Sequence, residues 1–200
     1  MKKLIIVIFI IWAAFQLEAR MMVQLGVGVD VNGKQSFSNA ALSQDSDVET
    51  GASLYGELLS SQKLGTGTLL AGLGLEYQIP RELKDLSFDS HKRKFSYLPI
   101  YLTGKYVLLP LSISPEAILQ AGYNFPVYTD NYASSATDNL KVSGGFYWGM
   151  GLGVDIRPLV IQVMYKSSKS TFKWDDDVDA ENLKTTSTNS QISLQLGLRL

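Results

Sequence analysis

Apolar and polar residues alternate without exception over the last nine residues of the chain, from Ile192 to Leu200. Successive side chains of a β-strand point to opposite faces, so this alternation predicts a strand with one aliphatic face and one polar face. The pattern recurs along the chain, with aliphatic residues at one parity and glycine, charged or polar residues at the other. A strand has this composition when its outer side faces lipid and its inner side faces a polar lumen.

Seven further segments repeat the alternation, and none has the spacing of a helix. In the longest of them, residues 142–157, aromatic and aliphatic residues alternate with a run of glycines. With the terminal strand at 188–200 there are eight predicted strands, the other seven covering residues 23–31, 51–59, 68–78, 94–107, 115–125, 142–157 and 159–173. Their lengths are close to the ~9–11 residues that a tilted strand needs to cross a bilayer.

The connections between these segments alternate between short and long. The short ones are residues 60–67, 108–113 and 157–158, and the long polar ones are residues 32–50, 79–93, 126–141 and 174–187. An even number of strands, with short turns at one end and long loops at the other, is typical of a transmembrane barrel. Pro99 lies inside a predicted strand and cannot donate to a ladder, so we expect a bulge or a distorted register near it.

The N-terminus has the features of a secretory signal peptide. Lysines precede an unbroken apolar run from Leu4 to Phe15, and Ala19 offers a small residue for cleavage. The run is shorter than the roughly 20 residues that span a bilayer as a helix. We therefore expect residues 1–19 to be a signal peptide and residues 20–200 to form one barrel domain, with an uncleaved N-terminal anchor as the alternative.

Composition argues against several classes of function. The formal net charge of −1 is not that of a nucleic-acid-binding protein. The chain has no cysteine, which excludes disulfides, thiolate metal sites, a thiol nucleophile and a lipid-modified N-terminal cysteine. The one histidine, His91, lies beside Asp89 and Ser90 in a polar loop, where adjacent residues cannot orient one another as a catalytic triad requires. We expect no catalytic residue and no cofactor.

Carboxylates at alternate positions from Asp175 to Glu181 have the spacing that begins a calcium-binding loop. Ala180 occupies the position of the expected glycine, and Thr186 that of the expected final acid. A solvated acidic loop is the simpler interpretation, and we expect no metal site.

The polar residues of the alternating segments predict what fills the barrel. The interior of an eight-stranded barrel is just wide enough to be filled by its own side chains. Buried charges are stable only when they are paired and hydrogen-bonded, and five acids and four bases fall at inward positions. We therefore expect a salt-bridge network in the lumen formed by Asp30, Glu57, Glu76, Lys105, Glu116, Asp155, Arg157, Lys166 and Arg199. A closed barrel is the first interpretation, and a narrow path for water or ions is the alternative.

Lysines at the rim of the predicted barrel suggest a contact with lipid. The outward parity of two strands is continued there by Lys92, Lys94, Lys169 and Lys173. On the lipid side of an extracellular rim, phosphorylated headgroups of lipopolysaccharide would be their partners by charge pairing. Ordinary solvation of strand ends is the alternative.

The signal peptide, the eight alternating strands, the four long and three short connections and the terminal strand together resemble the small outer-membrane β-barrel proteins. The comparison is with the outer-membrane-protein-X type and with the barrel of the outer-membrane-protein-A type. Residues 95–106 also resemble the leucine-proline-aliphatic strand of that superfamily. The resemblance implies an all-β, eight-stranded, antiparallel, up-and-down transmembrane barrel, exported by its signal peptide to a bacterial outer membrane. It also implies insertion by the barrel assembly machinery, which reads the last strand; Leu200 stands where that family usually has an aromatic residue.

We expect a non-enzymatic, surface-exposed protein that supports envelope integrity or mediates surface interactions through its four loops. Its expected partners are outer-membrane lipid and lipopolysaccharide, the assembly machinery and an unidentified extracellular partner. A narrow pore for water, ions or small solutes is the second interpretation, and a lipid-modifying enzyme is the third. The alternative fold is a soluble calycin-like barrel, which would place its apolar face inside and its charged face outside.

Overall fold

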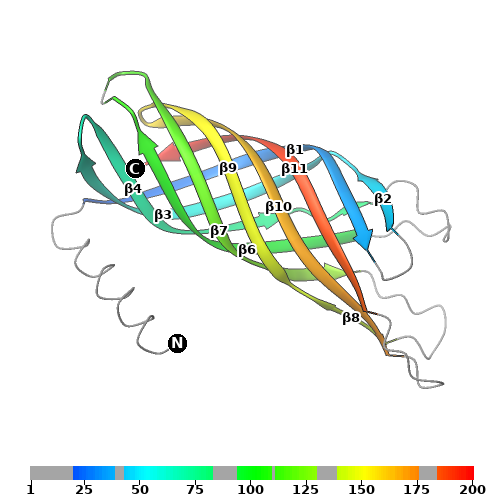
Figure 1. Ribbon diagram of the computed structural model, residues 1–200. Coiled ribbons are helices and arrows are strands. Elements are labelled where there is room, and N and C mark those ends of the chain that lie inside the picture. Colours follow the sequence, from blue (N-terminus) through cyan, green and yellow to red (C-terminus); the bar gives the residue numbers. More distant parts are fainter. Residues whose placement is uncertain (1–19, 39–42, 83–93, 110, 130–138, 176–183) are drawn as a thin grey trace, which may run out of the picture.

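The computed structural model describes residues 20–38, 43–82, 94–109, 111–129, 139–175 and 184–200. In this part of the chain, eleven β-strands form one antiparallel sheet, which closes on itself because its first and last long strands pair (Figure 1). No helix long and apolar enough to cross a membrane occurs among these residues. The predicted all-β, eight-stranded antiparallel barrel is confirmed. The predicted signal peptide, residues 1–19, lies outside the described residues.

Eight long strands build the barrel wall and follow one another in sequence order: β1 (Arg20–Ser38), β3 (Gly51–Leu64), β4 (Gly67–Gln78), β6 (Lys94–Val107), β7 (Ser114–Thr129), β9 (Gly145–Ile156), β10 (Leu159–Asp175) and β11 (Lys184–Arg199). The seam is closed by β1 and β11, where Val23 and Leu200 exchange backbone hydrogen bonds of 3.0 and 2.8 Å. Each residue can be followed to its partner on the next strand. One such circuit of the barrel starts on β1 at Gln24 and returns to β1 at Gln35. This stagger means that the strands are tilted, as closure of a barrel requires.

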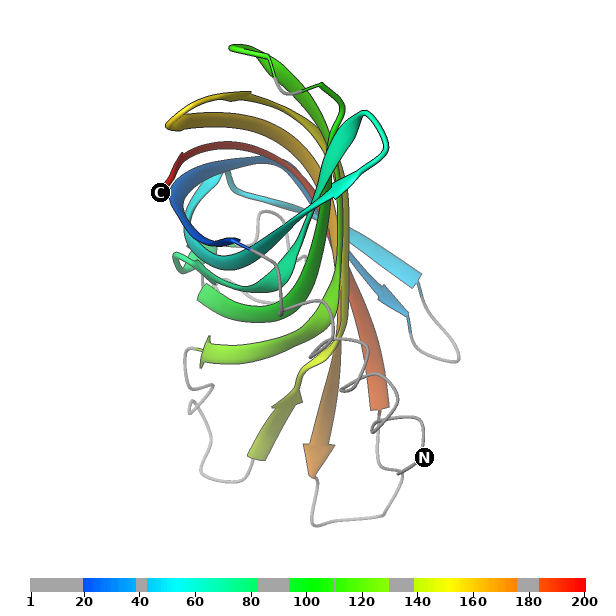
Figure 2. The same cartoon turned by 90° about the vertical axis from the view of Figure 1, so that its left-hand side faces the viewer.

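The two ends of the barrel differ. At one end, which we call the turn end, the connections between strands are short and the C-terminus lies beside β1 (Figure 2). One of the two connections of two residues at this end contains Gly65, whose positive φ of 62° suits glycine. The opposite end, which we call the loop end, carries the long connections.

Three short strands extend the wall at the loop end. They are β2 (Ser43–Val48), paired with β1, β5 (Arg81–Glu82), paired with β6, and β8 (Asn139–Ser143), paired with β10. The regions predicted to be long loops therefore contain more strand than the sequence indicates. The single strand predicted at 142–157 is also wrong in detail, because β8 and β9 separate at Gly144. The ladder between β7 and β9 ends there, and a Cβ on Gly144 would collide with the carbonyl oxygen of Asn124.

The irregularity expected near Pro99 lies a few residues away from it. The register between β6 and β7 shifts between Ser96 and Tyr97. The ladder between β4 and β6 ends at Ile100, so Pro99 stands just beyond the last pairing on that side. The missing amide hydrogen of the proline therefore breaks no ladder with β4.

The exposed and buried faces of the wall follow the alternation. Large aliphatic side chains cover the outside; Leu119 and Leu152, for example, are 67% and 70% exposed. Charged side chains point inward, and Glu76 and Lys105 are fully buried. A soluble calycin-like barrel would show the reverse arrangement, so the structure excludes that alternative fold.

Candidate functional site

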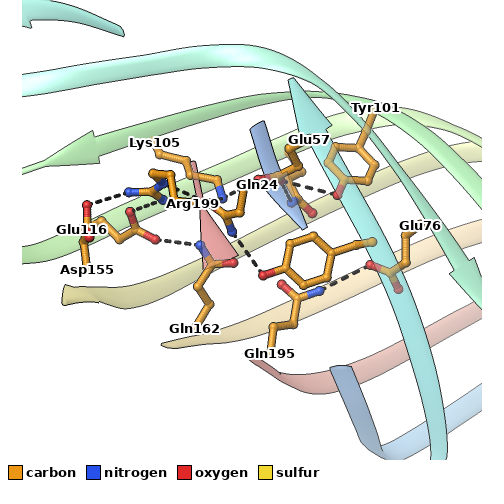
Figure 3. Close-up of polar contacts among 12 residues, drawn as sticks. Gln24, Glu57, Glu76, Tyr101, Lys105, Glu116, Asp155, Gln162, Gln195 and Arg199 are labelled. Carbon is orange, nitrogen blue, oxygen red and sulfur yellow. Dashed lines mark hydrogen bonds and ion pairs between the residues drawn. The ribbon is translucent and has the colours of Figure 1, made fainter. Parts of the chain in front are cut away.

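Arg199, close to the end of β11, is the centre of a first group of buried charges, which we call the turn-side cluster (Figure 3). Its guanidinium donates to Asp155 Oδ2 at 2.8 Å, to Glu116 Oε2 at 2.9 Å and, through Nε, to Gln24 Oε1 at 3.0 Å. These acceptors lie on β9, β7 and β1, so one side chain ties four strands together across the lumen. Several fixed donors of the guanidinium are used at once, which suits arginine and not lysine.

Lys105, on β6, carries the turn-side cluster to the opposite wall. Its Nζ lies 2.5 Å from Glu57 Oε2 and 3.2 Å from Gln24 Oε1. The Gln24 amide therefore accepts from both cations of the cluster, and its Nε2 donates to the Tyr55 hydroxyl at 3.1 Å. Glu57 also accepts from Gln120 at 3.3 Å. Every ionised group of this cluster has a partner of opposite charge.

A second group of charges, the loop-side cluster, lies further from the turn end. Lys166 Nζ is 2.6 Å from Glu76 Oε2 and 3.7 Å from Asp30 Oδ1. Asp30 is also paired with Arg81, which donates to Gln191 Oε1 at 2.8 Å. The four charges of this cluster balance, as the desolvation of buried ions requires.

Arg81 is the member of the network that the sequence analysis missed. It belongs to β5, inside a region predicted to be a loop, and follows Pro80, where the alternation of β4 ends. Its side chain is nevertheless buried in the lumen. The absence of a side chain at Gly51 makes room for it, because a Cβ there would collide with the Arg81 side chain.

Arg157 is the predicted lumen residue that the structure places elsewhere. Its side chain is 73% exposed and lies 3.6 Å from Asp155. It stands in the turn that follows the last residue of β9, Ile156, so the alternation of the strand no longer fixes its direction. The other eight predicted residues are buried inside the barrel, and Arg81 restores the number of inward bases to four.

Tyrosines and a small apolar group fill the space around the charges. Tyr101 and Tyr147 are buried with their ring centroids 5.5 Å apart. Inward glycines make room for such rings: a Cβ on Gly26 would come within 2.5 Å of the Tyr55 ring. Nearer the turn end, an apolar cluster packs inside the barrel, formed by Leu59, Leu70 and Val107 with Met22 packed against it.

The described lumen consists of paired charges, buried tyrosines and apolar side chains. Across the ranges that the structure describes, no three His, Cys, Asp or Glu side chains are grouped to hold a metal ion. His91 lies outside those ranges, and so does most of the acidic segment that follows Asp175.

Of the four rim lysines, the structure describes the side chain of Lys169. Lys169 is exposed on the outer face of β10, the face that also carries Tyr165. Lys92 lies outside the described residues, as do the side chains of Lys94 and Lys173. The strands that carry Lys94 and Lys169, β6 and β10, are separated in the wall by β7 and β9.

No protein-family model and no curated protein sequence matches the chain. Among solved structures it is similar to the outer membrane protein OprG from Pseudomonas aeruginosa, with a TM-score of 0.60 and 14% identity over 90% of this chain and 95% of that one. It is also similar to a major outer membrane protein from Thermus thermophilus, with a TM-score of 0.51 and 12% identity over 90% of this chain and 100% of that one. Likeness at these identities shows a shared fold, the barrel of small outer-membrane proteins.

Proposed function

We propose that this chain, which has the fold of small outer-membrane barrels, resides in a bacterial outer membrane as a closed, non-enzymatic barrel. The observation that carries the proposal is the inverted distribution of side chains, with exposed aliphatic residues surrounding paired, buried charges. An apolar surface that encircles the molecule marks a membrane-embedded protein. In such barrels the short turns face the periplasm, so the loop end would face the outside.

The charge clusters support a closed lumen. A path through the barrel would have to separate pairs such as Arg199 with Glu116 and Lys105 with Glu57. Leaving one partner of a buried ion pair alone costs about 3–5 kcal/mol. The apolar cluster around Leu59 fills further space near the turn end. A barrel that conducts nothing would serve the envelope by its stability and by the surface that its loop end presents.

Lipopolysaccharide is the partner that the outer surface supports best. Two aromatic pairs lie on the outer face of the wall. The ring centroids of Trp148 on β9 and Tyr165 on β10 are 5.5 Å apart, and those of Tyr123 and Phe125, both on β7, are 4.8 Å apart. Aromatic side chains gather where a membrane meets water. Lys169 continues the outward face of β10 beyond Tyr165, where it would meet phosphorylated headgroups by charge pairing. Insertion is proposed to use the assembly machinery acting on β11.

Single-channel recording in planar bilayers tests the closed barrel. We expect no discrete conductance steps from the wild-type protein, and steps from a Lys105→Ala/Arg199→Ala variant that has lost both cations of the turn-side cluster. Leu119→Ala, which alters only the outer face, is the matched control. Heat-modifiable mobility on unboiled gels checks that each variant is folded. Discrete steps from the wild-type barrel would favour the narrow pore instead.

The lipid contact is tested by replacing Lys92, Lys94, Lys169 and Lys173 with glutamine. We expect co-purification of lipopolysaccharide with the barrel to fall several-fold, because each lysine would contribute one salt-sensitive ion pair. Replacing the same four lysines with arginine, which keeps their charge, is the matched control. Unchanged lipopolysaccharide in the fourfold glutamine variant would contradict this part of the proposal.

A further inference from the structure

A cavity of about 670 Å³ opens at the turn end of the barrel, between the apolar cluster and the rim. Four of its lining residues are cations from separate elements of the wall, Arg20, Lys63, Arg157 and Arg199, and its only acid is Asp155. Sites for small molecules commonly have volumes of ~300–1,000 Å³. This space, which we call the turn-end cavity, therefore has the size of a binding site and an excess of positive charge.

The excess is not neutralised within the described residues. Arg199 is paired with Glu116 and shares the carboxylate of Asp155 with Arg157, whereas Arg20 and Lys63 have no acidic partner in the part of the chain that the structure covers. Arg20 has the inward parity of Gln24, which places it at the mouth of the lumen. Clefts lined by one sign of charge, with walls of low dielectric constant, attract ions of the opposite sign.

One part of the cavity wall is apolar. Met22, Leu70 and Val107 line it, and Leu70 and Val107 are 2% and 3% exposed. These side chains belong to the apolar cluster, and the buried Arg199 and Asp155 of the turn-side cluster line the cavity beside them. A cationic rim above an apolar floor suits a ligand with an anionic group at one end and a short hydrocarbon body at the other.

We propose that the turn-end cavity binds an anionic amphiphile, a carboxylate or phosphate joined to a short alkyl chain, from the periplasmic side. The anion would lie among Arg20, Lys63 and Arg157, since guanidinium groups match both oxyanions with paired hydrogen bonds. The alkyl chain would pack against Leu70 and Val107. The periplasmic side rests on the outer-membrane orientation proposed above, whereas binding itself needs neither an open lumen nor lipopolysaccharide and is tested separately.

Calorimetry on the full-length barrel in nanodiscs of zwitterionic lipid tests this site, with hexyl phosphate and hexanoate as probes. We expect saturable binding of at least one probe, and binding at least about tenfold weaker for hexanol and for inorganic phosphate, each of which lacks one half of the ligand. A Lys63→Gln/Arg157→Gln variant should lose at least about tenfold in affinity, because two charge-assisted contacts are removed. Both side chains are exposed, so the variant is expected to fold.

Lys169→Gln, an exposed lysine at the loop end, is the matched control and should bind as the wild type does. Tighter binding of hexyl phosphate indicates a phospholipid-like source for the ligand, and tighter binding of hexanoate a fatty-acid-like source. Equal affinity for inorganic phosphate, equal affinity for hexanol, or an unchanged Lys63→Gln/Arg157→Gln variant would each overturn the proposal.

Discussion

At the scale of single residues, the alternation decides which charged side chains point into the lumen, but only for residues within a paired strand. Arg157 comes one residue after the end of β9 and is 73% exposed, although its position in the alternation is inward. Arg81 follows Pro80, where the alternation of β4 has ended, so the sequence pattern does not predict its direction. It reaches the lumen because β5 pairs with β6 at the rim. The sequence therefore predicts inward residues within strands well and those at strand ends poorly.

Gly51 tests the placement of Arg81. A Cβ at this position would collide with the Arg81 side chain, so Gly51→Val should displace it from Asp30. We expect a loss of about 1–3 kcal/mol in the free energy of unfolding, the usual cost of overpacking. Urea unfolding in lipid vesicles measures it. Gly104→Ala is the control, because a Cβ there meets nothing within 4 Å. Equal stability of the Gly51→Val variant and wild type would contradict the position of Arg81.

Arg199 tests the turn-side cluster. Arg199→Ala leaves the buried carboxylates of Glu116 and Asp155 without this cation, and we expect the free energy of unfolding to fall by about 3–5 kcal/mol. Arg157→Ala removes a largely exposed partner of the same Asp155 and should cost about 0–1 kcal/mol. The same unfolding assay compares the two. Similar losses from both would mean that Arg199 is not the centre of the cluster.

At the scale of the strands, the sequence predicts all eight long strands. Several of the predicted strands are too short at the loop end of the barrel. β1 continues to Ser38 and β11 begins at Lys184, beyond the predicted ends at residues 31 and 188. The physical reason is that lipid imposes an apolar outer face only inside the bilayer. Beyond it, strands still pair through their backbones, as β1 does with β2, but their side chains no longer alternate in polarity.

The seam between β1 and β11 gives a direct test of register. Val29 pairs with Leu194, and the chain has no cysteine of its own. A Val29→Cys/Leu194→Cys variant should form a disulfide under mild oxidation, because paired Cα atoms lie about 5.5 Å apart or closer. Gel mobility under non-reducing conditions reports the cross-link. The shifted pair Val29→Cys/Leu196→Cys is the control and should cross-link far less; the reverse result would refute the register.

At the scale of the whole molecule, the inverted arrangement of polarity separates lipid, wall and lumen. Leu152→Cys, on the outer face, should react with a lipid-soluble maleimide and not with a charged one. Gln120→Cys, whose native side chain is 4% exposed inside the barrel, should react slowly with both. Labelling of reconstituted vesicles, followed by mass spectrometry, measures the two rates. Rapid reaction of Gln120→Cys with the charged reagent would indicate an aqueous lumen.

The sequence predicts most of the charged residues that lie in the lumen. It does not predict which of them form ion pairs with one another. Parity identifies Lys105, Lys166 and Arg199 as inward, but it does not say which carboxylate each one meets. The tilt of the strands decides that, because it brings residues from distant parts of the chain to the same height. The turn-end cavity was not predictable for the same reason: its cations are far apart in sequence and meet only when the barrel closes.

The hydrogen bonds between Val23 and Leu200 make the wall a ring in which the first strand has no special place. A circular permutant follows from this: the chain could be opened between Gly65 and Thr66 and its old ends joined by a short linker from Leu200 to Arg20. All eight ladders would keep their partners, so we expect the same barrel to form. Its assembly would then begin with β4 and finish with β3.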